Sequence, residues 1–231
     1  MKIAILDPHR PNEPFPPLNT ALDEPNGLLA VGGCLSATRL LNAYRHGIFP
    51  WYNANEPILW WSPNPRLVLF PERLQVSRSL RKTLRKDTFT VTFDTVFDKV
   101  IRACANSRQN REGTWITGDI MHAYQELHLL GFAHSAETWR EGELVGGLYG
   151  VAIGRVFFGE SMFHTETDSS KTAFAVLVQH LKDWNFELID CQVYTHHLAS
   201  LGAELIGRNN FMHLLDRYCT LPAASSAWQA S

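Results

Sequence analysis

Apolar and polar residues alternate regularly only after residue 65. Where apolar side chains recur at every second position, the pattern predicts a strand with one buried face. Turn-forming residues divide 134–163 into three such strands, which predicts an antiparallel meander with turns at 141–142 and 154–155. Further strands are predicted at 66–70, 89–93, 186–193 and 203–207.

Apolar residues with helical spacing fill the segments between these strands. Four residues mark expected helix ends: Ser77, Asp94 and Thr117 as N-caps, and Gly131 as a C-terminal stop. The predicted helices are 77–86, 94–104, 117–131, 168–184, 196–203 and 209–219. This order of elements predicts a mixed α+β fold, and residues 222–231 are expected to fray.

Residues 1–65 hold most of the 12 prolines and a single recognisable helical stretch, at 36–46. The segment 47–66 is rich in turn formers and aromatic residues, so we expect it to be ordered by side-chain packing without backbone ladders. We therefore predict a small irregular N-terminal domain, 1–65, packed against a larger domain, 66–231.

The composition is that of a folded protein: of 231 residues, 45% are hydrophobic and 19% are charged. No apolar run reaches the roughly 18 residues of a transmembrane helix. The N-terminus breaks into proline and charge before a signal peptide could form, so a cytoplasmic protein is expected. The scattered cysteines predict reduced thiols and neither a disulfide frame nor a zinc site.

The net charge of −2 is unevenly distributed. Between residues 66 and 111, eleven Lys and Arg face four acidic residues, a local net charge of +7. Four of these cations share one arc of the predicted helix 77–86: Arg78, Arg81, Lys82 and Arg85. They would repel one another unless phosphates neutralise them, which favours contact with the phosphates of a nucleic acid over a merely solvated cationic face.

Aromatic and polar residues supply further candidates. Trp51 and Trp115 lie in predicted loops, where they are suited to stack on an unpaired base, whereas Trp60 and Trp61 are expected in the core. Asp190 and Gln192 share one face of a predicted strand, with Cys191 pointing away, and Glu160 follows another strand. A charge in so apolar a strand is either functional or part of a buried polar network.

Six apolar residues near these polar groups are candidates for a slot that receives an apolar group. They are Leu148, Phe157, Phe174, Leu177, Leu181 and Ile189. The pattern alone does not separate such a slot from ordinary core. The sequence contains no P-loop, dinucleotide-binding glycine motif, serine-hydrolase elbow or HExxH motif, and a metal site is not expected.

Longer motifs carry a resemblance to a known family. They are EPNGLLAVGG, GIFPWY, LWWSPNPR, EGTWIT, ELVGGLYGV, FFGESMF, SKTA, LIDCQV and ASLGAE. Together they resemble the leucyl/phenylalanyl-tRNA–protein transferases of the bacterial N-degron pathway, from about Glu24 to Gly207. The resemblance implies a small N-terminal domain followed by a catalytic domain of the GNAT acyltransferase fold.

The implied reaction transfers Leu or Phe, and Met less well, from aminoacyl-tRNA to proteins with N-terminal Arg or Lys, marking them for degradation. No cofactor is implied, because the donor ester is already activated. Where GNAT enzymes hold coenzyme A with an R/QxxGxG/A loop, this chain has MFHTETDSSK. A monomer without a membrane partner is expected.

The resemblance also implies roles for individual residues. Asp190, hydrogen-bonded to Gln192, would accept or steer the proton of the attacking amine and fix Gln192 against the ester carbonyl. Glu160 would attract the cationic acceptor terminus. Four aromatic residues would border the terminal adenosine and its aminoacyl group: Trp51, Trp115, Tyr44 and Tyr124. The apolar slot would exclude β-branched side chains.

The sequence departs from the family pattern at several positions. Tyr194 and Thr195 follow DCQV where the family has DCQVxN, so a role for Thr195 in place of the amide is left open. Leu148 stands where the family has Met and Leu177 where it has Phe, which leaves the preference between Leu and Phe open. Two other functions remain: an N-acyltransferase that uses coenzyme A, and a non-catalytic tRNA-binding module.

Overall fold

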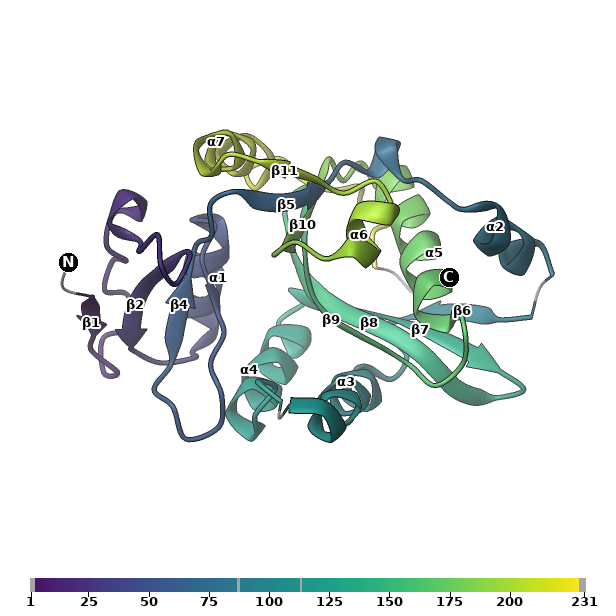
Figure 1. Cartoon of the computed structure of the whole chain (residues 1–231), viewed down its shortest axis with the longest axis horizontal. Helices are drawn as coiled ribbons and strands as arrows, with labels where there is room; N and C mark the ends of the chain where they lie inside the picture. Colours follow the sequence, from purple (N-terminus) through teal and green to yellow (C-terminus); the bar gives the residue numbers. More distant parts are fainter. Residues whose placement is uncertain (1–2, 87, 113, 229–231) are drawn as a thin grey trace.

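The computed structural model describes residues 3–86, 88–112 and 114–228. It contains two sheets, a small one built by the first 61 residues and a large one built by the rest (Figure 1). The small sheet has the strand order β1-β2-β4-β3. Its strands are β1 (Ala4–Leu6), β2 (Leu28–Gly32), β3 (Phe49–Pro50) and β4 (Leu59–Trp61), with helix α1 (Ala37–Arg45) beside them.

The small sheet corrects one expectation for the segment 47–66. That segment does form backbone ladders, because β3 pairs with β4 and β4 pairs with β2. Trp60 anchors the pairing: its side chain is fully buried, as expected, and its indole Nε1 donates to the carbonyl of Gly32. Strands of two or three residues are too short to show periodicity, and long-range pairing stabilises them.

The large sheet is mixed and has the order β11-β5-β10-β9-β8-β7-β6. Its strands are β5 (Arg66–Leu69), β6 (Thr90–Phe93), β7 (Ala133–Arg140), β8 (Glu143–Ile153), β9 (Val156–His164), β10 (Leu188–Gln192) and β11 (Glu204–Ile206). Strands β9 and β10 run parallel, whereas β7, β8 and β9 form the predicted antiparallel meander. The topology confirms an α+β fold with a mixed sheet behind a small N-terminal part.

Helices cover both faces of the large sheet (Figure 1). On β8, Tyr149 faces the helices α3 (Phe97–Glu112) and α4 (Gly118–Leu129), whereas the preceding Leu148 faces α5 (Ser169–Asp183). The remaining helices are α2 (Arg78–Arg85), α6 (His196–Ser200), α7 (Arg208–Tyr218) and the short 3-10 turns η1 (Leu18–Thr20) and η2 (Pro71–Arg73). The core cluster on the α3 face continues into the small sheet through Tyr44 and Trp60. The domain boundary at residue 65 stays a prediction.

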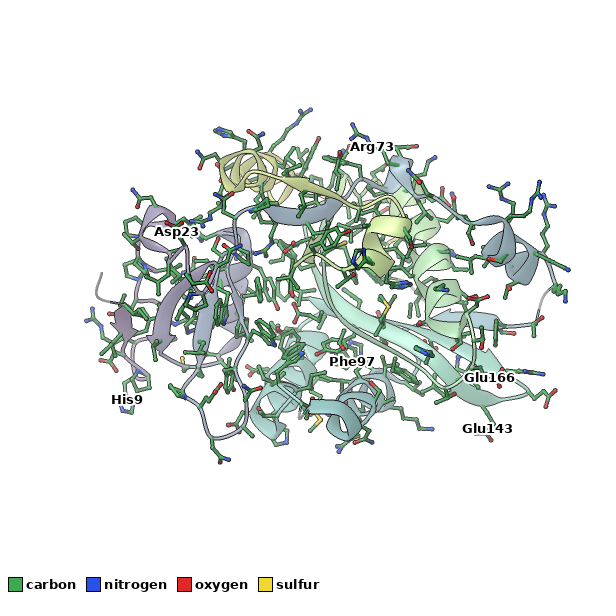
Figure 2. The ribbon with its side chains drawn as sticks, viewed as in Figure 1. His9, Asp23, Arg73, Phe97, Glu143 and Glu166 are labelled. Carbon is green, nitrogen blue, oxygen red and sulfur yellow. The ribbon has the colours of Figure 1, made fainter. Side chains whose placement is uncertain are left out.

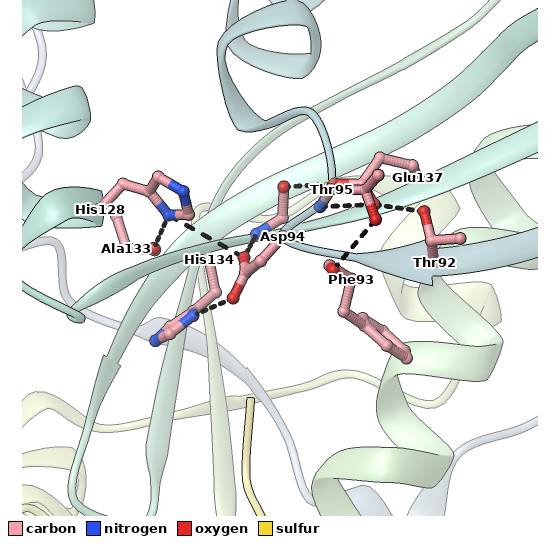
Figure 3. A network of polar contacts seen from close by, with 9 residues as sticks. Thr92, Phe93, Asp94, Thr95, His128, Ala133, His134 and Glu137 are labelled. Carbon is pink, nitrogen blue, oxygen red and sulfur yellow. Dashed lines mark hydrogen bonds and ion pairs between the residues drawn. The ribbon is translucent and has the colours of Figure 1, made fainter. Parts of the chain in front are cut away.

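Two predicted caps are confirmed and one is wrong. The hydroxyls of Ser77 and Thr117 accept the N–H groups of Leu80 and Ile120, as N-caps do. Asp94 caps no helix: α3 begins at Phe97, and the Asp94 carboxylate instead binds His134 and the N–H of Ser135 on β7 (Figure 3). A carboxylate close to a strand end thus has stronger partners on the neighbouring strand than at the helix.

The C-terminal tail is also more ordered than expected. Trp228 packs against a cluster of aromatic side chains, and its ring stacks on His134 with 3.9 Å between centroids. The tail is therefore packed as far as residue 228, and the prediction of fraying is wrong to that point. The prediction for residues 229–231 lies outside the described part of the chain.

Candidate active site

A cavity of about 290 Å³ opens on the α5 face of the sheet, between β8, β9, β10 and α6. Part of its wall is apolar, and three polar side chains lie together on another part: Glu160, Asp190 and Gln192. Val193, Thr195 and His197 also line it. A largely apolar cavity with a few converging polar groups has the character of a binding site for a small group.

Four of the six predicted slot residues line this cavity: Leu148, Phe157, Phe174 and Ile189. Leu177 and Leu181 do not. They lie on the same face of α5 as Phe174, one and two turns further along, and are almost fully buried in the core cluster beneath. Helical periodicity identified the buried face correctly, but only the N-terminal end of that face reaches the cavity.

Asp190 is held by an arginine that the sequence analysis missed. Arg66 Nε donates to Asp190 Oδ1 at 2.8 Å, and Arg66 Nη2 donates to Oδ2 at 2.6 Å. The guanidinium lies over the rings of Phe49 and Phe211, at 4.7 and 4.9 Å from the centroids. Both charged side chains are at most 1% exposed. Both oxygens of the Asp190 carboxylate are therefore engaged by one guanidinium, and the expected role of Asp190 in handling the proton of the amine stays a prediction.

Gln192 departs from regular strand geometry. The register of β10 against β5 shifts between Asp190 and Gln192, and the φ angle of Gln192 is 61°. The Gln192 N–H donates to Asp190 Oδ1 at 2.9 Å. The predicted hydrogen bond between Asp190 and Gln192 is present, but it joins the Asp190 carboxylate to the backbone of Gln192, because the bulge interrupts the two-residue alternation of side chains. The bulge also brings Cys191 to the cavity wall, although strict alternation pointed it away.

Glu160 is the centre of the polar group. Its Oε1 accepts the Gln192 amide at 2.8 Å and the Tyr44 hydroxyl at 2.7 Å, and its Oε2 accepts the Tyr124 hydroxyl at 3.0 Å. Burial, with a smaller contribution from the charge of Asp190, raises the pKa of Glu160 to about 7 although the three hydrogen bonds act to lower it. Glu160 can therefore gain or lose a proton near neutral pH.

Tyr44 and Tyr124 lie behind Glu160 and do not line the cavity. Both are fully buried, and their hydroxyl oxygens also lie in contact with each other. Burial raises the pKa of both phenols well above the usual value, so they stay protonated and act as donors. Both hydroxyls donate to Glu160, and a place for Tyr44 and Tyr124 beside an aminoacyl-adenosine stays a prediction.

The two candidate stacking residues lie away from the cavity. Trp51, 45% exposed, follows β3, and its backbone carbonyl accepts the Trp61 indole N–H at 2.6 Å. Trp61 is half-buried beside it, and the centroids of the two tilted rings lie 5.8 Å apart. Trp115 is half-buried against the core in the loop before α4. A role in stacking on adenine stays a prediction for Trp51 and Trp115.

Helix α2 has the predicted two-sided character. Leu80 is buried, and the four cations of the predicted arc are all exposed: Arg78, Arg81, Lys82 and Arg85. Side chains with nitrogen tips project from α2 into the surroundings (Figure 2). No described residue pairs any of these four with a carboxylate within ion-pair distance. The surface is open to an anionic partner, and phosphate contact stays a prediction.

The sequence contains a feature that points to Arg66, although the alternation of apolar and polar residues does not reveal it. Arg66 is the single charge in β5, and Asp190 is the single charge in β10. Two lone opposite charges in buried strands are expected to pair, because neither is tolerated alone. Thr195, which lines the cavity beyond β10, is instead placed by a helix cap, since its Oγ1 accepts the N–H of Leu198.

Comparisons with known proteins identify the family of the chain. A family model described as leucyl/phenylalanyl-tRNA protein transferase matches residues 68–216, and a model of the N-terminal domain of the same family matches residues 33–64. The chain belongs to the leucyl/phenylalanyl-tRNA–protein transferase family. It is therefore an aminoacyltransferase. A transferase of that name from Methylococcus capsulatus is 56% identical over 227 residues, which cover 98% of this chain and 97% of the relative.

Solved structures matched by this transferase are more distant. FemX has a TM-score of 0.47 at 10% identity, covering 78% of this chain and 71% of that chain. A GCN5-related N-acetyltransferase from Kribbella flavida has a TM-score of 0.40 at 11% identity, and the match covers 72% of this chain and 60% of that chain. Among the described residues, no helix is long and apolar enough to cross a membrane. The same residues contain no group of three or more His, Cys, Asp or Glu side chains that could hold a metal ion.

Proposed function

We propose that this chain transfers Leu or Phe, and Met less well, from aminoacyl-tRNA to the α-amino group of proteins that begin with Arg or Lys, and so marks them for degradation. The observation that supports this reaction most is the position of Glu160. A carboxyl with a pKa of about 7 lies beside a carboxamide in a cavity whose wall is otherwise largely apolar.

The chemistry is aminolysis of an ester. The α-amino nitrogen attacks the ester carbonyl, the bond between that carbon and the ribose oxygen breaks, and the ribose oxygen takes a proton. An α-ammonium group has a pKa near 8. Ionised Glu160 is suited to accept its proton, because the two pKa values differ by about one unit. The negative charge of Glu160 also attracts the cationic acceptor terminus.

Asp190 and Gln192 position the reactants in this proposal. The Arg66 pair fixes Asp190, Asp190 fixes the backbone of Gln192, and the Gln192 amide then bridges Glu160 and the ester carbonyl region. Most of the acceleration is expected from orientation, since the ester is already activated. The apolar wall of the cavity would receive the Leu or Phe side chain, and α2 and the exposed Trp51 would contact the tRNA.

The decisive experiment supplies radiolabelled Leu-tRNA and a peptide with N-terminal Arg. Label is expected in that peptide and in its N-terminal Lys counterpart, and not in the same peptide with N-terminal Ala. Two further reactions test the alternatives. Ribonuclease treatment of the donor should abolish transfer, and leucyl-coenzyme A should not replace Leu-tRNA. Binding of tRNA without label in any peptide would overturn the proposal in favour of a tRNA-binding module.

A further inference from the structure

Trp228 packs against the outer side of the cavity wall. Its ring lies nearly parallel to the ring of Phe157, with 5.9 Å between centroids and 28° between planes. Phe157 itself lines the cavity. The C-terminal tail thus reaches a residue that contacts whatever the cavity receives, and it does so from the far end of the chain, beside α5 and β6 (Figure 1).

Phe157 has little freedom to move while Trp228 is in place. A Cβ atom built on Gly150 would lie 2.5 Å from Phe157 Cζ, so the ring tip already fills the space above that glycine. Trp228 packs against the ring of Phe157 as well. Because core side chains are close-packed, removing Trp228 would give the Phe157 ring room to move away from the cavity.

The position of Trp228 is well defined. Its ring stacks on His134 with 9° between planes, and His134 Nδ1 bonds to Asp94 Oδ2 at 2.7 Å (Figure 3). The backbone of the tail is anchored by Ala224, whose N–H donates to the carbonyl of Trp184 at the end of α5. The indole Nε1 has no hydrogen-bond partner among the described residues, so packing alone holds the ring.

We propose that Trp228 is a specificity-determining residue that limits the size of the side-chain pocket by holding Phe157 in its wall. This inference rests on the proposed function, in which the cavity receives the aminoacyl side chain. Trp228 lies beyond residues 68–216, which the family model matches, and it acts through Phe157 without contacting the substrate. It is a positioning residue.

The test compares two donors with one acceptor. The variant Trp228→Ala leaves space behind Phe157, the ring relaxes into it, and the pocket gains room. The ratio of kcat/KM for Phe-tRNA to that for Leu-tRNA should then rise about fivefold, since hydrophobic pockets discriminate by roughly 10–200-fold per methylene-sized difference and the relaxation is partial. Trp228→Phe should keep a ratio close to that of the wild type, because the variant retains an aromatic ring and removes no hydrogen bond.

A matched control separates specificity from stability. Ile101→Ala also removes buried apolar volume, but on α3, in the core cluster on the opposite face of the sheet. It should lower the melting temperature and leave the Phe-to-Leu ratio unchanged. A ratio that stays within twofold of wild type in Trp228→Ala would overturn the inference.

Two other outcomes are told apart from these. If the wild-type protein transfers neither amino acid, that result overturns the proposed function itself and does not concern Trp228. If Trp228→Ala does not fold, as judged by its thermal melt, Trp228→Leu takes its place in the same assay. An unchanged ratio in Trp228→Leu would then overturn the inference.

Discussion

Arg66 and Asp190 form a buried bidentate ion pair between neighbouring strands, and each lies in a strand that is otherwise largely apolar. Removing one partner leaves the other charge in the core without compensation. We expect Arg66→Met to lower the free energy of unfolding by about 3–5 kcal/mol, measured by urea denaturation. It should also reduce transfer, because Gln192 loses the anchor of its backbone.

Arg73 offers the control for that experiment. It pairs with Glu204 on the surface, where its side chain is 62% exposed. Exposed pairs contribute about 0–1 kcal/mol, so Arg73→Met should change stability little and transfer not at all. Equal losses in the two variants would show that the buried pair has no special role.

Glu160 predicts the pH dependence of transfer. Its pKa of about 7 means that kcat/KM should fall about tenfold per unit below pH 7, as the carboxyl becomes protonated and can no longer accept a proton. In Glu160→Gln the acceptor must lose its own proton to solvent, so the acid limb should move up towards about 8 and the plateau should drop. Glu166→Gln, which removes a partly exposed carboxylate paired with Arg140, should keep the wild-type profile.

The same carboxyl affects stability in the opposite direction. Its folded-state pKa lies above the unfolded value, so between these two values the folded protein binds more protons. Stability should therefore decrease as pH rises from about 4.3 to about 7, and Glu160→Gln should remove this component of the slope. Urea denaturation at pH 5 and pH 7.5 would measure it. A wild-type and variant difference that does not change with pH would contradict the assignment.

Helix α2 predicts salt-dependent binding of tRNA. Replacing Arg81 and Arg85 by Gln removes two exposed cations without touching the buried Leu80. Affinity should fall, and the slope of log K against log salt should decrease by roughly 0.7–0.9 for each phosphate that the helix no longer neutralises. Arg217→Gln on α7 removes an exposed cation from another helix and should leave the slope unchanged. The same slope in all variants would exclude α2 from the interface.

A substitution at Leu177 tests whether this residue lines the apolar slot or belongs to the core beneath it. Because it is 1% exposed and lies beneath the cavity, Leu177→Ala should lower the free energy of unfolding by about 2–5 kcal/mol. The exposed Leu205 on β11 is the control, and Leu205→Ala should change stability by less than about 0.5 kcal/mol. If Leu177→Ala instead changed the amino-acid preference strongly with little loss of stability, Leu177 would be assigned to the pocket.

The parts predicted well from sequence are those that local forces determine. Ser77 and Thr117 cap their helices because each hydroxyl meets an N–H three residues away, and the meander follows from strict alternation and two tight turns. The polar trio of Glu160, Asp190 and Gln192 could be predicted because charged and carboxamide side chains are rare in apolar strands.

The parts predicted badly depend on interactions between distant segments. Neither the bulge that turns Gln192 towards Glu160 nor the attraction of Asp94 to β7 leaves a trace in residue spacing. Tyr44 and Tyr124, 80 residues apart, meet only in the folded chain. The same holds for Trp228, whose ring packs against side chains from β6, β7, β9 and the end of α5.

The sandwich of Arg66 between Phe49 and Phe211 has a consequence for biosynthesis. Phe49 comes from the early strand β3 and Phe211 from α7, so one side of the guanidinium stays exposed to water until α7 has been synthesised. A nascent chain that has not yet released α7 from the ribosome should therefore be incompetent for transfer, even though every residue of the polar trio has already been made.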